Sequence, residues 1–344
     1  MQGVVDGYLE ALRVGEGMHF DRMTLFPVFR DGESPLRYLV LEEALAAGLV
    51  EVREQPSARV PELSLVNRSD GMVLVLDGEE VAGGKQNRMA NASFLIAPWS
   101  ELALPVTCVE HGRWHDVAPS FDSGEAGYFS LRREKEEQVR ANLRAMGAMA
   151  SDQLAMWDSM AARQSRAGIS SATGAMGDLY QGMAKSLSEY ERAFRAVEGA
   201  VGMAVALNGR MAGADLFDQA ATAAKLWRKL VRSYGLDALD GGEGGPVGRD
   251  RAERLLRRLI GARVESFPSA GLGHDLRLAG DRAVGSALLF EGVVVHLAIF
   301  RIHGRRSHGE PMSMARASLR RRLRTVPRNR EEGASGADAP GTAE

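Results

Sequence analysis

The chain has 344 residues, 45% of them hydrophobic and 26% charged, which is typical of a globular protein with one large or two modest domains. Its formal net charge of −2 provides no overall field that would draw it to nucleic acid or to a membrane. The single cysteine, Cys108, excludes an intrachain disulfide and fits a reducing cytoplasm. We expect a cytoplasmic protein, because no run approaches the ~18 apolar residues of a membrane span and no signal peptide is evident.

The first 130 residues alternate short apolar runs with turn signals, which predicts strands joined by short connections. Pro27 indicates that the first strand lies at an edge or ends early, because proline cannot donate a hydrogen bond to a neighbouring strand. Asp77-Gly78 predicts a tight hairpin. Short helices are expected at residues 4–12 and 42–47. The expected strands are residues 23–29, 37–41, 49–53, 62–66, 72–76, 79–82, 93–97, 101–104 and 106–109.

The middle of the chain has apolar residues at spacings of three and four, which predicts amphipathic helices. Residues 131–166 predict a long helix whose polar opening, RREKEEQ, is a solvated end. Asn208-Gly209 predicts a hairpin, and Asp215 is expected to cap the helix that follows. Two further helical stripes are expected at residues 176–197 and 216–234, a short basic helix at 251–260, and strands at 263–267, 275–278, 285–290 and 293–300.

These patterns predict an α+β fold, in which the N-terminal and C-terminal thirds form a mostly antiparallel β-sheet around a helical middle. We expect one domain over residues 1–303; the alternative is a β-rich domain to about residue 130 and a separate helical domain. The parts of the single domain are β-rich at 20–130, helical at 131–262 with an inserted hairpin at 201–214, and β-rich at 263–302.

The end of the chain, residues 304–344, differs in composition from the rest. Nine arginines lie between Arg305 and Arg330, and a run of small polar residues follows. This composition predicts a largely disordered tail. A basic tail of this kind is suited to contact acidic partners or nucleic acid.

The densest set of polar side chains lies in two apolar-flanked stretches, residues 76–98 and 104–114. Lysine and arginine neutralise phosphate or carboxylate groups, and amides orient hydroxyls or bases. We therefore predict a pocket for a small anionic, nucleotide-like ligand, with Glu79 or Glu80 as acid or base if the protein is a hydrolase. The predicted ligand-binding residues are Lys85, Gln86, Asn87, Arg88, Asn91, Glu110, Arg113 and Trp114.

The alternative is a structural cluster in a non-enzymatic interaction or assembly protein. Burial separates the two: convergence on an open pocket favours a ligand site, and mutual pairing favours structure. The sequence has none of the common zinc-binding motifs and predicts no metal site, and it identifies no cofactor. Cys108 and His296 lie in apolar strands, where a buried cysteine and a hydrogen-bonded core histidine are the usual cases.

Several separated motifs carry a resemblance to a known family. They are GEEVAGGKQNRMANASFLIAP, LPVTCVEHGRW, DLFDQ, LWRKLVRSYGLDAL, FPSAGLGHDLRL and GSALLFEGVVVHLAIF. They resemble a family of prokaryotic proteins named for association with ADP-ribosylglycohydrolase and rhodanese-phosphatase superfamily proteins, over about residues 20–302. The name implies a context of ADP-ribose or NAD-linked metabolism, and it transfers no catalytic residue. Beside the polar residues above, Cys108, Asp218 and His296 match the motifs.

Overall fold

The computed structural model describes residues 1–302, apart from residues 33, 56–60, 114–120 and 243. Met1–Arg305 cluster as one compact unit. The predicted tail, residues 304–344, lies outside the described residues, so its disorder and its partners stay predictions.

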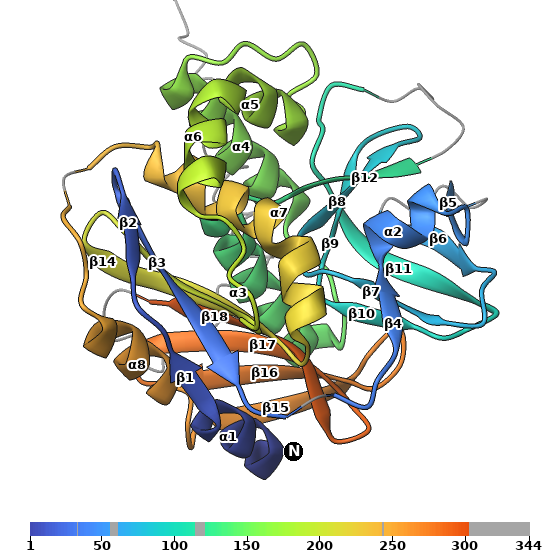
Figure 1. The fold of residues 1–344 in the computed structure, drawn as a ribbon. Helices are drawn as coiled ribbons and strands as arrows, with labels where there is room; N and C mark the ends of the chain where they lie inside the picture. The colour runs from blue at the N-terminus through green and yellow to red at the C-terminus, as the bar shows by residue number, and fades with distance from the viewer. Residues whose placement is uncertain (33, 56–60, 114–120, 243, 303–344) are drawn as a thin grey trace, which may run out of the picture. The chain divides into compact units, whose positions relative to one another are not determined.

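The largest sheet joins strands from both ends of the chain with a hairpin from its middle (Figure 1). Its nine strands are β1 (Leu12–Val14), β2 (Met18–Phe20), β3 (Met23–Arg30), β13 (Gly202–Leu207), β14 (Arg210–Phe217), β15 (Arg263–Pro268), β16 (His274–Gly280), β17 (Ala283–Phe290) and β18 (Val293–Arg301). They run in the order β1-β3-β13-β14-β18-β17-β16-β15, with β2 beside β3, and every pair is antiparallel. The predicted α+β fold, with terminal strands around a helical middle, is confirmed.

The remaining strands of the N-terminal third form two smaller sheets. A three-stranded sheet has the order β10-β7-β4, with β7 and β4 parallel. A six-stranded antiparallel sheet has the order β12-β8-β9-β11-β6-β5. Their strands are β4 (Tyr38–Val40), β5 (Val50–Glu54), β6 (Glu62–Asn67), β7 (Met72–Val75), β8 (Glu79–Gly83), β9 (Arg88–Ala90), β10 (Phe94–Ile96), β11 (Ser100–Cys108) and β12 (Phe121–Ala126).

Helices cover both faces of the nine-stranded sheet. The helices of the described chain are α1 (Gln2–Glu10), α2 (Leu41–Ala46), α3 (Phe129–Met146), α4 (Gln153–Ala167), α5 (Met176–Gly182), α6 (Ala184–Ala193), α7 (Ala220–Ala238) and α8 (Arg249–Arg257). α1 and α8 share one hydrophobic cluster with the sheet, and α6 and α7 share another. α3 lies between the nine-stranded sheet and the smaller sheets (Figure 1). Its Arg132 pairs with Asp215 of β14, and its Lys135 pairs with Asp77 in the turn after β7.

The helix predicted over residues 131–166 is two helices, and its polar opening is not solvated. Gly147 ends α3 in the left-handed conformation, with φ of 65°, where glycine has no steric penalty. The prediction of a solvated start was wrong, because Arg132, Lys135 and Glu136 are at most 1% exposed. Their charge suggested solvent, but each has an ion-pair partner inside the protein.

Three local predictions at turns and strand ends also fail, each for a clear reason. Asp77-Gly78 makes a turn, with Gly78 at φ of 81°, but β7 and β8 belong to different sheets and do not form a hairpin. Pro27 lies in β3, which is an internal strand. It falls between the part of β3 that pairs with β2 and the part that pairs with β1, so the backbone N–H that proline lacks is not needed there. Asp215 lies within β14, and Gln219 is the residue that precedes α7.

Candidate functional site

Four of the predicted polar residues, Glu80, Asn87, Glu110 and Arg113, come together where β8, β9 and the end of β11 meet. β9 lies between β8 and β11, so the loop of residues 84–87 reaches the segment that follows Cys108. The amide of Val109 donates to the carbonyl of Asn87 at 3.0 Å and fixes this contact. Gly84 allows the loop to turn, because a Cβ on it would lie 2.3 Å from the Phe121 ring.

Glu79 is a buried, ion-paired carboxylate. Its Oε1 accepts hydrogen bonds from Lys229 Nζ at 2.8 Å and from Ser123 Oγ at 2.6 Å, and its Oε2 accepts the Leu76 amide at 3.0 Å. The side chain has no exposed surface. With its oxygens occupied by a cation and two further donors, Glu79 is suited to join β8 to α7 rather than to exchange protons.

Glu80, the next residue, has a different environment. Its Oε1 accepts a hydrogen bond from Asn87 Nδ2 at 3.1 Å, and it forms no ion pair with any residue that the structure describes. The residue is 3% exposed, and this burial raises the pKa of Glu80 to about 7, although the hydrogen bonds from the Asn87 side chain and the Glu125 backbone lower it. The charges of Glu125 and Glu110 act in the same direction as burial. Gly124 leaves room for the carboxyl group, since a Cβ there would lie 2.6 Å from Oε2.

Asn87, Glu110 and Arg113 fix the geometry around Glu80. Arg113 Nη2 donates to Glu110 Oε2 at 2.6 Å and to Asn87 Oδ1 at 2.9 Å, and the Asn87 amide donates to Glu110 Oε2 at 3.0 Å. Burial alone would raise the pKa of Glu110, but the hydrogen bond from Arg113 brings it below its usual range. These contacts orient the side-chain amide of Asn87 so that its Nδ2 donates to Glu80.

The other predicted ligand-binding residues have separate environments. Arg88 is 1% exposed, donates to the Gln86 carbonyl at 2.9 Å and lies 3.8 Å from Glu54. Asn91 is buried between Thr107 and the carbonyl of Met149. Gln86 is buried and Lys85 is half-buried. Trp114 lies outside the described residues, so its role stays a prediction.

Cys108 is buried, as predicted, and its backbone is bound on both sides by the Gln153 side chain. Burial raises the pKa of the Cys108 thiol to about 11, so the thiolate needed of a nucleophile is scarce at neutral pH. Among residues 1–302, with the gaps at 33, 56–60, 114–120 and 243 left aside, no group of three or more metal-binding side chains converges.

Sequence reasoning missed a second polar network, on the face of α3 that meets the sheets. Lys135 pairs with Asp77 in the turn after β7, and also donates to the Ala90 carbonyl at 3.0 Å. Arg132 donates to both carboxylate oxygens of Asp215 on β14. Both cations are fully buried. α3 thus joins a small sheet to the large sheet through charged contacts.

Asp215 is the centre of this second network. It accepts a hydrogen bond from Tyr234 at 2.8 Å, and its Oδ1 lies 3.3 Å from His296 Nε2. The other ring nitrogen of His296 is 2.8 Å from Ser93 Oγ. Burial would raise the pKa of Asp215, but Arg132 and His296 hold it well below its usual range. The prediction of a hydrogen-bonded core histidine at residue 296 is confirmed.

One signal in the sequence pointed to the network. Arg132, Lys135 and Glu136 follow Leu131 and precede Val139 at helical spacings, so the charged residues share the apolar face of α3. Their anionic and cationic partners lie far away in sequence, and only the folded chain identifies them. Glu136 contacts Arg277 of β16, which also binds Asp275.

The fold and the polar cluster define a class: an α+β protein with a preorganised, buried carboxyl group between strand ends. The chain belongs to the ARG and Rhodanese-Phosphatase-superfamily-associated Protein family, whose domain model matches residues 11–300. The resemblance seen in the sequence motifs is thus confirmed. Comparisons with curated proteins and with solved structures found no match. In the described chain, no helix combines the length and apolar character needed to cross a membrane.

Proposed function

We propose that the protein binds an anionic, nucleotide-like ligand, of the ADP-ribose type, beside Glu80, and that Glu80 exchanges a proton with it. One observation carries the proposal. Glu80 is a buried carboxyl group without a cationic partner among the described residues, and burial moves its pKa to about 7. A carboxyl group that changes protonation near neutral pH is suited to general acid–base chemistry, as in hydrolysis.

Neighbouring residues have supporting roles in this proposal. Asn87 orients the Glu80 carboxyl group through its hydrogen bond, and Arg113 orients Asn87. Lys85 is a half-buried cation of the same loop, and in this proposal its ammonium group neutralises a phosphate group of the ligand. Arg88 and Glu110 are buried and act by shaping the loop. The ligand would therefore approach from the side of Lys85.

A second candidate function rests on a different observation. Glu79, Glu110 and Arg113 are paired with other protein groups, which is the pattern expected of a structural cluster. A non-enzymatic interaction or assembly protein would need the cluster only for the fold. A cytoplasmic location suits both functions and is part of the proposal, since the only cysteine is a buried free thiol.

A comparison of the wild type with the variants Glu80→Gln and Lys85→Ala distinguishes the two proposed functions. Glu80→Gln keeps the shape of the side chain and an oxygen that accepts from Asn87, but cannot exchange a proton. In an assay of ADP-ribose and nucleotide hydrolysis, we expect wild-type turnover that Glu80→Gln abolishes while ligand binding persists. Lys85→Ala should weaken binding. Ligand binding that Lys85→Ala leaves unchanged, or turnover that Glu80→Gln leaves unchanged, would refute this site.

A further inference from the structure

A cavity of about 400 Å³ lies at another place, where the β13–β14 hairpin meets the start of α3, the end of α7 and the end of β18. Its volume lies within the range of small-molecule sites. Phe129, Leu207, Met211 and Ala212 form an apolar part of its wall. Glu80, Asn87, Glu110 and Arg113 form the Glu80 cluster described above, and none of them lines this cavity.

Three arginines, Arg133, Arg210 and Arg301, line this cavity. None of them forms an ion pair with a carboxylate in the part of the chain that the structure describes. The lining has one acidic side chain, Asp237, which accepts hydrogen bonds from the Ser130 amide at 2.5 Å and from Ser130 Oγ at 2.8 Å. With three arginines and one aspartate, the lining has a formal charge of +2.

The positive charge extends beyond the cavity. Partial burial lowers the pKa of Arg301, and the nearby charges of Arg258, Arg210, Arg251 and Arg282 lower it further. Arginines that repel one another in this way gain from a bound anion. The guanidinium group presents several donors in a plane and suits the oxygens of a phosphate group.

A neutral polar group also lines the cavity. The side-chain oxygen of Asn208 is buried and has no hydrogen-bond partner among the described residues. A buried acceptor without a partner costs free energy unless a ligand or water supplies a donor. Because this oxygen has almost no accessible surface, the Asn208 side chain would turn toward the cavity to accept a hydroxyl group of a ligand.

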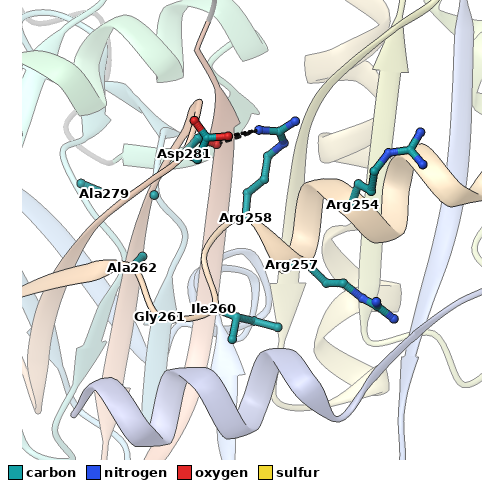
Figure 2. A pocket seen from close by; sticks show the side chains of 9 residues that line it. Arg254, Arg257, Arg258, Ile260, Gly261, Ala262, Ala279 and Asp281 are labelled. Atoms are coloured by element: carbon teal, nitrogen blue, oxygen red, sulfur yellow. Dashed lines mark hydrogen bonds and ion pairs between the residues drawn. The ribbon is translucent and has the colours of Figure 1, made fainter. Parts of the chain in front are cut away.

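A larger hollow of about 570 Å³, beside the C-terminal end of α8, is a poorer anion site (Figure 2). Arg258 is bound to Asp281 there at 2.9 Å, and Arg254 is bound to Asp250 at 2.6 Å. Figure 2 shows that the side chains of Arg254, Arg257 and Arg258 point in different directions. These arginines do not converge on one anion, and Arg257 provides a control for the other cavity.

We propose that the cavity lined by Arg133, Arg210 and Arg301 binds a hydroxylated phosphomonoester, such as a sugar phosphate. The phosphate group contacts the arginines, a hydroxyl group donates to Asn208, and the carbon skeleton packs against the apolar wall. The site is separate from the proposed Glu80 site and does not depend on it.

Isothermal titration of the full chain with glucose 6-phosphate tests this proposal. Glucose is the uncharged counterpart and inorganic phosphate is the counterpart without a sugar. Arg210 is exposed, so Arg210→Ala should fold normally, which the melting temperature without ligand verifies. We expect glucose 6-phosphate to bind more tightly than phosphate, glucose not to bind, and Arg210→Ala to weaken binding about tenfold, as for the loss of one charge-assisted contact.

Arg257→Ala is the matched control, and Lys85→Ala tests the other site. Both should leave the affinity for glucose 6-phosphate unchanged. The proposal is overturned if neither phosphate probe binds at millimolar concentration, if Arg210→Ala binds like the wild type, or if Arg257→Ala loses as much affinity as Arg210→Ala. If only Lys85→Ala loses affinity for glucose 6-phosphate, the phosphate group binds at the Glu80 cluster instead.

Discussion

The buried pair between Arg132 and Asp215 should be essential for stability, and Asp215→Asn tests this. The substitution preserves the size of the side chain and removes its charge. Arg132 then stays fully buried, with Asp77 at 3.8 Å as its other carboxylate neighbour. Breaking a buried pair costs about 3–5 kcal/mol. Because the asparagine oxygen still accepts one hydrogen bond, we expect about 3 kcal/mol here.

The measurement is the free energy of unfolding from urea titration, with thermal melting alongside. A loss of 3 kcal/mol corresponds to a fall of roughly 5 °C in melting temperature for a unit of this size. Asp31→Asn is the matched control, because Asp31 pairs with Arg13 on the surface, with side chains 86% and 63% exposed. That change should cost less than about 0.5 kcal/mol. Equal effects of the two substitutions would refute the assigned role of Asp215.

Three further predictions follow from single residues. The folded-state pKa of Glu80, about 7, lies above its ordinary value of 4.5, so its contribution to stability is complete below pH 4.5 and lost as pH rises through 7. The free energy of unfolding of Glu80→Gln, relative to that of the wild type, should therefore rise by roughly 2–3 kcal/mol between pH 4.5 and pH 8 in unfolding titrations. A difference that does not change with pH would contradict this. Gly78→Ala should lower the melting temperature more than Gly48→Ala does. Both positions have positive φ, but only at Gly78 would the new Cβ lie 2.8 Å from the Arg132 side chain. Cys108 should react with a thiol reagent only in denaturant, and fast labelling of the native protein would contradict its burial.

Local patterns in the sequence were enough to predict most strands and the fold class. Asn208-Gly209 and Glu291-Gly292 form the turns of the β13–β14 and β17–β18 hairpins, as expected from their backbone preferences. The pairing of Asp77-Gly78 was mispredicted, because the turn type is local whereas the choice of partner strand depends on the whole sheet. The division of the N-terminal strands into two small sheets has the same origin.

The candidate sites were predictable to different degrees. The motif around Glu80 stood out because polar residues are dense there, and the structure brings four of them, Glu80, Asn87, Glu110 and Arg113, together. Charge alone did not reveal that Glu79 pairs with Lys229, 150 residues away, whereas Glu80 has no such partner. The arginine-lined cavity also escaped, because Arg133, Arg210 and Arg301 meet only through sheet pairing and helix packing.

The most direct test of the account is a thermal-shift measurement of the full chain with ADP-ribose, NAD and nucleoside diphosphates. Binding to the folded state adds about 2.7 kcal/mol to the free energy of unfolding at a ligand concentration of a hundred times Kd. The melting temperature rises as a result. We predict a rise with at least one of these ligands that Lys85→Ala reduces and Arg210→Ala does not. No shift with any of them, or a shift that Lys85→Ala leaves unchanged, would contradict ligand binding at the Glu80 cluster.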